Sequence, residues 1–233
     1  MEDKKYFSRQ IDESLMAWKN STRHKPLLLR GARQVGKSSS VRHLAKQFDN
    51  FVEINFERKP AYLEIFKGDR DAKHIVEMIK SITGEPIVPG KTLLFFDEIQ
   101  MCQEAISSLR FFWEDMPGLH VIAAGSLLEF ALSEIPTFGV GRIHSMFMYP
   151  MSFDEFLNAL GMFSLQKYKR EASQEKPLLS ALHEQLVSLF RTYLMVGGMP
   201  ESVSTWVDTH SYVECQAVQK EIAYTYEVDF AKY

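Results

Sequence analysis

One short glycine-rich segment constrains the fold of this 233-residue chain more than any other feature. Residues 31–38 have the sequence GARQVGKS, which fits the pattern GxxxxGK[ST]. An apolar run, Leu27–Leu29, precedes the segment, and an amphipathic stretch, Ser38–Phe48, follows it. A loop between a strand and a helix is the context in which this pattern binds nucleotide phosphates. The sequence therefore predicts a phosphate-binding loop (P-loop).

Each residue type in this loop suits phosphate binding for a chemical reason. Gly31 and Gly36 permit the dihedrals that the loop needs and a close approach to the ligand, so that backbone N–H groups surround a polyphosphate. The helix that follows adds partial positive charge. The Lys37 ammonium is expected to reach the β- and γ-phosphates, and the Ser38 hydroxyl to ligate Mg²⁺. The residues predicted to contact the nucleotide are Gly31, Ala32, Arg33, Gln34, Val35, Gly36, Lys37, Ser38 and Ser39.

An acidic pair follows the most apolar run of the chain, in a Walker B pattern. Leu93–Phe96 is continuously apolar, as expected of a central strand that is covered on both faces. Asp97 and Glu98 come directly after it, at the end of the strand where open α/β sheets bind ligands. We expect Asp97 to hold Mg²⁺ directly or through water, and Glu98 to orient and deprotonate the attacking water. The alternative is an acidic cap of the next helix, which the P-loop upstream makes the weaker interpretation.

Two weaker signals concern a serine and an arginine. Ser126 follows the apolar run His120–Ala124 and could place its hydroxyl beside the γ-phosphate, or it could cap a helix at Leu127–Leu132; the two roles are compatible. Arg142 opens the apolar run Ile143–Tyr149 and could stabilise charge on the transferring phosphoryl group. Its spacing alone favours a surface arginine at the edge of a strand.

The order of the elements predicts an α/β fold with a central parallel sheet. Apolar runs alternate with helix-like segments, which is typical of βαβ units. An amphipathic helix is expected within residues 1–25, with Phe7, Ile11, Leu15 and Trp18 on one face. The two helices expected between the first strands are Ser38–Phe48 and Asp71–Thr83. The expected strands are Leu27–Leu29, Phe51–Phe56, Thr92–Phe96, His120–Ala124 and Ile143–Tyr149.

The pattern changes after Pro150, where strands cease and helices continue. Ser152 is expected to begin the first helix, with Glu155 at the capping-box position. The polar stretch Ser164–Lys176 is expected to be a surface linker. The helices expected here are Ser152–Leu160, Leu178–Val196 and Tyr212–Phe230. We therefore predict two domains: residues 1–151, a P-loop domain with its amino-terminal helix, and residues 152–233, a smaller helical domain.

Composition excludes several other classes of protein. With 45% hydrophobic residues and a formal net charge of −3, the chain is neither a disordered protein nor a broadly basic nucleic-acid binder. It has no apolar run of the roughly 18 residues that a membrane span needs, and its amino terminus is charged. Cys102 and Cys215 are isolated, so reduced thiols are expected and no transition-metal site. A cytoplasmic protein without a membrane partner is predicted.

Five segments, in order along the chain, resemble one known family. They are LLLRGARQVGKSS, LLFFDEIQ, AAGSLLEF, GVGRIHSMFMYPMSFDEFL and YLMVGGMPESV. They are similar to prokaryotic AAA-superfamily ATPases whose second half is a domain of unknown function. The resemblance implies a three-layer P-loop fold of the ASCE type, in which the strand before Ser126 lies between the P-loop strand and the Walker B strand. It implies ATP and Mg²⁺ as ligands. It assigns the roles above to Lys37, Ser38, Asp97, Glu98 and Ser126.

The same resemblance implies that Arg142 is an arginine finger or a nucleotide sensor. A right-handed crossover after Ser126 would bring Arg142 to the amino end of the sheet, away from the P-loop of its own chain. We therefore expect Arg142 to serve a neighbouring chain, which implies a homo-oligomer. Family members continue beyond a segment such as Ala223–Tyr233, so a truncated carboxyl terminus is expected.

Two functions follow from these residues. The first is Mg²⁺-dependent ATP hydrolysis coupled to a conformational change in the helical part; Glu98 favours it, since a pure binder needs no base. The alternative is a slowly hydrolysing switch that controls an unidentified protein or DNA partner. The side chains of Arg33 and Gln34 are expected to point outward from the loop, toward a partner or solvent. A GTPase is disfavoured because the chain has no NKxD motif. A small-molecule kinase is disfavoured because a water-activating Glu98 would hydrolyse ATP instead of allowing phosphate transfer to the substrate.

Overall fold

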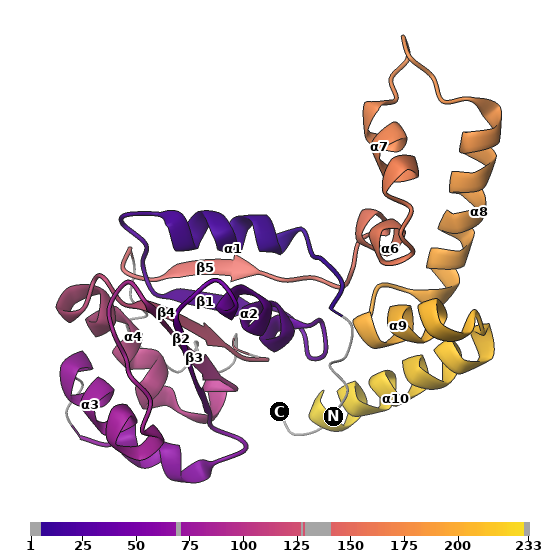
Figure 1. Cartoon of the computed structure of the whole chain (residues 1–233). Helices are drawn as coiled ribbons and strands as arrows, with labels where there is room; N and C mark the ends of the chain where they lie inside the picture. Colours follow the sequence, from indigo (N-terminus) through magenta and orange to yellow (C-terminus); the bar gives the residue numbers. More distant parts are fainter. Residues whose placement is uncertain (1–5, 69–70, 127, 129–140, 231–233) are drawn as a thin grey trace. The chain divides into compact units, whose positions relative to one another are not determined.

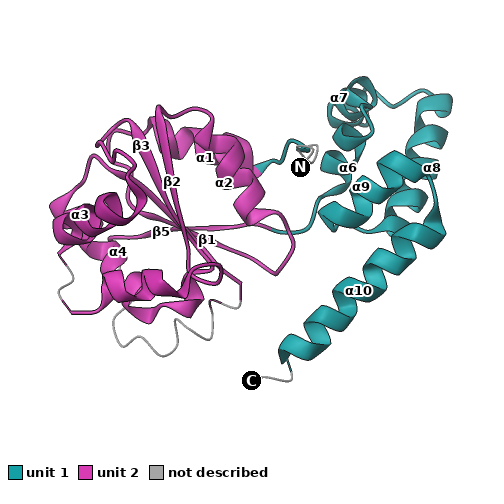
Figure 2. Ribbon diagram, turned by 60° about the horizontal axis from the view of Figure 1, so that its bottom comes forward, with its two compact units in different colours: residues 1–10, 149–233 teal, residues 11–148 magenta. Residues whose placement is uncertain are grey.

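The computed structural model describes residues 6–68, 71–126, 128 and 141–230. The chain divides into two compact units, which Figure 2 shows in different colours. The α/β unit is Ile11–Met148, and the helical unit combines Met1–Gln10 with Tyr149–Tyr233. The sequence-based division at residue 152 kept the amino-terminal residues with the first domain, whereas here residues 6–10 group with the helices.

A five-stranded, all-parallel sheet forms the centre of the α/β unit (Figure 1). Its strand order is β2-β3-β4-β1-β5, so β4 separates the P-loop strand β1 from the Walker B strand β3, as predicted. Leu29 of β1 and Asp97 of β3 both pair with Ala124 of β4, so the carboxyl ends of the three strands coincide. The strands are β1 Leu27–Arg30, β2 Asn50–Asn55, β3 Thr92–Asp97, β4 His120–Ala124 and β5 His144–Phe147.

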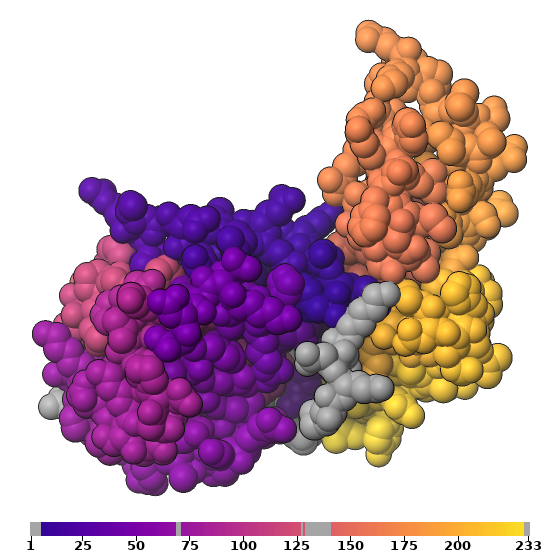
Figure 3. Space-filling model, in the orientation of Figure 1, coloured from indigo at the N-terminus to yellow at the C-terminus, as the bar shows by residue number. Residues whose placement is uncertain are grey.

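Helices cover both faces of this sheet, which makes three layers. Helices α1 and α2 lie on one side and α3 and α4 on the other, as Figures 1 and 2 both show. The side chains of β3 are all buried, because alternate residues face opposite helical layers. Figure 3 shows that side chains fill the spaces between the ribbons of this unit. The helices of the unit are α1 Ile11–Asn20, α2 Lys37–Ala45, η1 Pro60–Phe66, α3 Ala72–Thr83, η2 Ile99–Met101 and α4 Gln103–Asp115.

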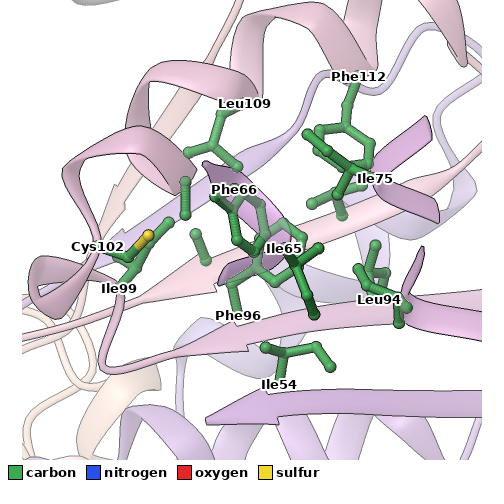
Figure 4. Close-up of a cluster of buried hydrophobic side chains, with 14 of the residues drawn as sticks. Ile54, Ile65, Phe66, Ile75, Leu94, Phe96, Ile99, Cys102, Leu109 and Phe112 are labelled. Atoms are coloured by element: carbon green, nitrogen blue, oxygen red, sulfur yellow. The ribbon is translucent and has the colours of Figure 1, made fainter. Parts of the chain in front are cut away.

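The largest cluster of buried side chains lies between the sheet and the layer of α3 and α4. Leu94 and Phe96 of β3 point toward Leu109 and Phe112 of α4 in Figure 4. All four side chains are fully buried. This packing anchors β3, and with it the acidic pair that follows, against the helical layer. The predicted fold, a three-layer α/β sandwich with a central parallel sheet followed by a helical region, is therefore confirmed.

Three details of the predicted elements differ or cannot be compared. Phe7 does not join the first helix, which begins at Ile11; it packs instead in the core of the helical unit. The strand expected at Ile143–Tyr149 is shorter, at His144–Phe147. The helix expected at Leu127–Leu132 lies outside the described residues apart from Leu128.

The described residues of the helical unit, 6–10 and 149–230, contain five helices. The capping box that begins α6 is confirmed, because the Ser152 hydroxyl accepts from the Glu155 N–H at 3.3 Å and a Glu155 oxygen accepts from the Ser152 N–H at 2.7 Å. Helix α8 ends at Val196, as expected, and Gly197 follows it with a φ of 73°, a backbone conformation typical of glycine at a helix carboxyl end. The helices are α6 Phe153–Ala159, α7 Phe163–Glu171, α8 Ser180–Val196, α9 Pro200–Thr209 and α10 Tyr212–Phe230.

The prediction of a polar linker at Ser164–Lys176 is wrong, because most of this stretch is helix α7. Leu165 of α7 packs in a small buried cluster with Leu157 of α6 and Leu186 of α8. Only Leu165 and the adjacent Gln166 are buried among the residues of α7. Because so few of its residues face the core, the sequence of this helix shows little apolar periodicity. Packing against neighbouring helices, rather than local pattern, decides its conformation.

Both cysteines are free and buried, which confirms the prediction of thiols. Burial raises the pKa of the Cys102 thiol to about 11, and it also raises the pKa of Cys215. Both side chains therefore behave as small apolar groups rather than as nucleophiles. Among the helices that the structure describes, none is both long and apolar enough to cross a membrane.

Candidate nucleotide-binding and catalytic site

The P-loop follows β1 and has the backbone conformation that its glycines suggest. Gly31 has a φ of 142°, Gln34 of 62° and Gly36 of 98°. A Cβ atom on Gly31 would lie only 2.2 Å from the carbonyl oxygen of Met148, so no other residue fits there without a shift of the backbone. Gly36 is the N-cap of α2, which places the amino end of that helix next to the loop. The loop therefore offers backbone N–H groups and the helix dipole to an anion.

Lys37 directs its ammonium group into this loop. The Nζ atom donates to the carbonyl oxygens of Gly31, at 2.8 Å, and Ala32, at 2.7 Å. Desolvation lowers the pKa of Lys37 to about 8, although the charges of Glu98 and Asp97 oppose the shift. A polyphosphate bound here would favour the charged form of the lysine, so this buried cation fits an anionic ligand.

Asp97 is the centre of a group of oxygen and nitrogen donors at the end of β3. The Ser38 hydroxyl donates to its Oδ1 at 2.8 Å, and the Asn55 amide donates to its Oδ2 at 3.0 Å. Arg42, which also makes two hydrogen bonds to Glu53, approaches the same Oδ2 at 3.7 Å. Burial raises the pKa of Asp97, and the hydrogen bond from Ser38 opposes this.

A divalent cation fits this arrangement. The Ser38 hydroxyl and the Asp97 carboxylate are hard oxygen ligands of the kind that Mg²⁺ prefers, and they lie side by side at the mouth of the P-loop. A cation between them would also relieve the unfavourable burial of the carboxylate. These two residues are therefore the ones that could hold Mg²⁺ together with phosphate oxygens.

Glu98 follows Asp97 in a left-handed backbone conformation, with a φ of 53°. This conformation turns the chain out of the strand, so the Glu98 side chain does not continue the alternation of β3. Glu98 directly follows Asp97 at the end of β3, and its charge acts on both Asp97 and the P-loop Lys37. The Gln100 amide donates to its Oε2 at 2.6 Å. A carboxylate in this position can accept a proton from water.

Ser126, at the end of β4, is almost fully buried and accepts a hydrogen bond from Arg33 Nε at 3.2 Å. The expectation that Arg33 points outward is therefore wrong: its side chain reaches from the P-loop to the neighbouring strand. Gln34 is exposed, as expected. The structure thus brings the predicted P-loop residues, the acidic pair and Ser126 to one edge of the sheet.

Arg142 lies at the opposite edge. It precedes β5, whose first residue, His144, pairs with Leu27 at the amino end of β1. Its guanidinium group is half exposed and pairs with Glu114 of α4, Nε to Oε1, at 2.9 Å. The structure does not bring Arg142 to the P-loop of its own chain.

Three polar residues beside the site were not predicted: Asn55, Arg42 and Gln100. Asn55 had a signal, because it is a polar residue at the carboxyl end of a strand, as Asp97 is. An expected strand that ran on to Phe56 concealed it. Arg42 and Gln100 depend on how α2 and η2 pack beside the strands, and the sequence contains no local signal for either.

Comparison with known families is consistent with this geometry. Residues 23–157 match the family described as AAA domain. This chain belongs to the AAA domain family. No curated protein sequence matches it. The match ends within α6, so it covers the whole site and little of the helical unit. The resemblance to ATPases with a second domain of unknown function stays a prediction.

Two solved structures share the fold of this AAA chain. One is the Walker-type ATPase PABY2304 of Pyrococcus abyssi, with a TM-score of 0.58, 16% identity and coverage of 97% of this chain and 75% of that one. The other is PCH-2 of C. elegans, with a TM-score of 0.50, 13% identity and coverage of 91% and 68%. At these identities the likeness shows the fold.

Proposed function

We propose that this AAA chain is an ATPase that binds ATP with Mg²⁺ and hydrolyses it. The observation that supports the proposal is the convergence of three features at one edge of the sheet. These are the buried Lys37 in a P-loop, the Ser38–Asp97 pair at 2.8 Å, and the Glu98 carboxylate beside them. A protein that only bound phosphate would not need the third.

Each residue has a separate role in the proposed hydrolysis. Lys37 and the loop N–H groups bind the β- and γ-phosphates, and Ser38 with Asp97 holds Mg²⁺, which when bound neutralises phosphate charge. Glu98 accepts a proton from the water that attacks the γ-phosphorus, and ADP leaves as the bond to the γ-phosphate breaks. Ser126, held by Arg33, is proposed to contact the γ-phosphate from β4.

We also propose that nucleotide binding is coupled to the helical unit, and the contacts of two consecutive residues support this. Met148, the last residue of the α/β unit, donates its N–H to Arg30 at 2.8 Å and packs its carbonyl against Gly31. Tyr149, the first residue of the helical stretch, accepts a hydrogen bond from Arg9 at 2.7 Å. A change in the P-loop backbone would therefore act on a residue covalently joined to the helical unit.

A slowly hydrolysing switch is the second candidate, and the position of Arg142 favours it. With this arginine at the opposite edge of the sheet, a chain without a neighbour would lack an arginine finger from it. Such a chain would stay in the ATP state for longer and could control a protein or DNA partner. A homo-oligomer would complete the site, and a cytoplasmic location stays a prediction.

The proposed function is tested by ATP binding and phosphate release in matched variants. Lys37→Ala should abolish ATP binding, since it removes the buried cation, while exposed Lys67→Ala should bind like the parent. Glu98→Gln should bind ATP normally and lose roughly 10²–10⁴-fold in turnover, because the amide cannot take a proton. Exposed Glu77→Gln is its control. Equal turnover in Glu98→Gln and the parent would exclude the hydrolytic role of Glu98, and unchanged binding in Lys37→Ala would exclude the P-loop.

A further inference from the structure

Gln100 lies in η2, two residues after Glu98, and its amide is oriented by that glutamate. Its Nε2 atom donates to Glu98 Oε2 at 2.6 Å. An ionised carboxylate only accepts hydrogen bonds, so the NH₂ end of the amide must face it. The carbonyl oxygen, Oε1, therefore points to the other side. The amide has one orientation rather than two.

That carbonyl oxygen is buried and has no hydrogen-bond partner in the described part of the chain. It lies directly over Gly125: a Cβ atom on Gly125 would be 2.2 Å from Oε1 and 3.3 Å from Cδ of Gln100. A glycine at position 125 is thus what leaves room for the amide. Because Gly125 precedes Ser126, the Gln100 side chain spans from the Walker B glutamate to the end of β4.

The backbone between the two residues favours the same contact. Glu98 has a left-handed φ of 53°, which is unfavourable for a residue with a side chain. The turn is secured by Ile99, which is fully buried, and by a hydrogen bond from the Met101 N–H to the Glu98 carbonyl at 3.0 Å. If β3 continued past Asp97, Glu98 and Gln100 would lie on the same face of the sheet, separated along the strand by the rise of two residues. The turn brings the amide onto the carboxylate instead.

We infer that Gln100 is a positioning residue for Glu98, and that Gly125 is required because it admits the Gln100 amide. The inference rests on the proposed ATPase function. Gln100 holds one carboxylate oxygen, which leaves the other to accept the proton of the attacking water. The same amide ties the orientation of Glu98 to the end of β4, where Ser126 lies. Gln100 itself transfers no proton and touches no phosphate.

The test compares kcat, ATP KM and ATP affinity in the full chain. Gln100→Met keeps the volume of the side chain and removes the hydrogen bond, so the fold is retained. We expect kcat to fall about 10- to 100-fold with ATP affinity within about twofold of the parent, since a misplaced base slows only the chemical step. Gly125→Ala should give a similar loss. Exposed Gln103→Ala and the roomier Gly118→Ala, whose Cβ would meet nothing closer than 3.4 Å, are the matched controls.

Two double variants separate positioning from general damage. Gly125→Ala combined with Gln100→Ala should lose no more than Gln100→Ala alone, because the shortened side chain no longer meets the new Cβ atom at position 125. Gln100→Met should have no effect in a Glu98→Gln background, where no base remains to be positioned. Additive losses in either pair would overturn the inference.

Each of the other possible outcomes also tests the role of Gln100. Parent-like or increased turnover in Gln100→Met would show that Gln100 does not position Glu98. A parallel fall of kcat and ATP affinity would indicate a structural role and overturn the inference. Failure of the proposed function is distinguishable, since it would appear as unchanged turnover in Glu98→Gln whatever Gln100→Met does.

Discussion

At the scale of single residues, the site depends on two glycines, whose lack of a side chain leaves room for neighbouring polar groups. Gly31 has a φ of 142° and faces the Met148 carbonyl, and Gly125 faces the Gln100 amide. Each glycine allows a polar group to approach the sheet edge at a distance that a Cβ atom would prevent. The roles proposed for Lys37 and Glu98 therefore depend on neighbouring residues that contribute no functional group.

The first prediction concerns Gly31. Gly31→Ala should lower the free energy of unfolding by more than about 2 kcal/mol, because the new Cβ would overlap a backbone oxygen and the dihedral is strained. ATP binding should weaken with it. Gly84→Ala is the control: Gly84 has a φ of 72° but open space around its Cβ, so it should cost only about 1–2 kcal/mol. Urea unfolding of both variants gives the comparison, and equal losses would contradict the role of the Met148 contact.

Individual residues also show what could be predicted from sequence. Lys37, Ser38, Asp97 and Glu98 could be proposed from the sequence because their positions relative to strand ends follow a pattern with a known chemical reason. Gln100 was not found, since its contact depends on a left-handed turn at Glu98 and on a glycine of another strand. Local pattern indicates candidate residues for ligand binding, whereas the contacts among those residues depend on the tertiary structure.

At the scale of elements, α1 is joined to the sheet through two stacked histidines. The rings of His24 and His120 lie 3.7 Å apart, with Trp18 of α1 against the edges of both. His24 Nδ1 donates to the Ser21 carbonyl and His120 Nε2 to the Lys19 carbonyl, each at 3.0 Å. The other nitrogen of each ring is buried without a partner among the described residues. Each ring is therefore held by one hydrogen bond and buries its second nitrogen in apolar surroundings.

This arrangement predicts a loss of stability in acid. Burial lowers the pKa of His120 from 6.5 to about 4; the hydrogen bond to the Lys19 carbonyl opposes this shift, and the positive charge of the Lys19 side chain adds to it. Between these pH values the unfolded chain binds a proton that the folded chain does not, so stability falls as the pH falls. We expect a loss of roughly 1–2 kcal/mol between pH 7 and 5. His120→Gln should remove this component in urea unfolding at several pH values, and exposed His74→Gln should not. An identical pH slope in His120→Gln and the parent would contradict the prediction.

A second element, α6, depends on an ion pair inside the helical unit. Arg9 and Glu155 are nearly fully buried and meet at 2.9 Å; the same Glu155 oxygen accepts from the Gln10 N–H at 2.7 Å, while the other completes the capping box. Glu155→Gln should therefore destabilise the chain by about 3 kcal/mol, because it leaves the Arg9 charge buried without its counter-ion. Glu77→Gln, which breaks the exposed pair with Lys80, should cost less than about 0.5 kcal/mol. Similar losses in both variants would show that burial of the pair is unimportant.

The elements differ in how far sequence could predict them. Strands β3 and β4 were predicted closely, because a strand covered on both faces is a continuous apolar run. Helix α7 was missed, because its one deeply buried leucine has partners in α6 and α8 that no local pattern shows. The segment Tyr6–Gln10 was placed with the wrong helices for the same reason: the partners of Phe7 and Arg9 in the helical unit lie at Tyr149 and beyond in the chain.

At the scale of the whole molecule, the chain passes between its two units twice, after Gln10 and after Met148. The order of the strands, with β4 between β1 and β3, could be predicted from the family resemblance and not from local pattern alone. The same order determines which residues share an edge. It brings Lys37, Asp97 and Ser126 together and leaves Arg142 at the amino end of β5.

The last prediction follows from that position of Arg142. We expect turnover per site to rise with protein concentration, because the arginine can reach a γ-phosphate only in a neighbouring chain, where a finger contributes roughly 10³–10⁵ in rate. Arg142→Ala should lose this rise and keep the parent's ATP affinity. The substitution should leave stability nearly unchanged, since the exposed pair with Glu114 contributes less than about 1 kcal/mol. Loss of turnover would then not be a consequence of unfolding.

A mixing experiment separates this arrangement from its alternatives. Arg142→Ala chains retain a working P-loop, and Lys37→Ala chains retain the arginine, so a mixture should recover part of the activity that each lacks alone. Glu114→Gln, which frees Arg142 from its ion pair without removing it, serves as the control and should behave like the parent. A strong defect in Arg142→Ala with no concentration dependence would mean that the arginine acts within its own chain after a rearrangement of the sheet edge. Parent-like turnover of Arg142→Ala at every concentration would leave it as a surface residue paired with α4, because an exposed ion pair at the amino end of a sheet needs no catalytic explanation.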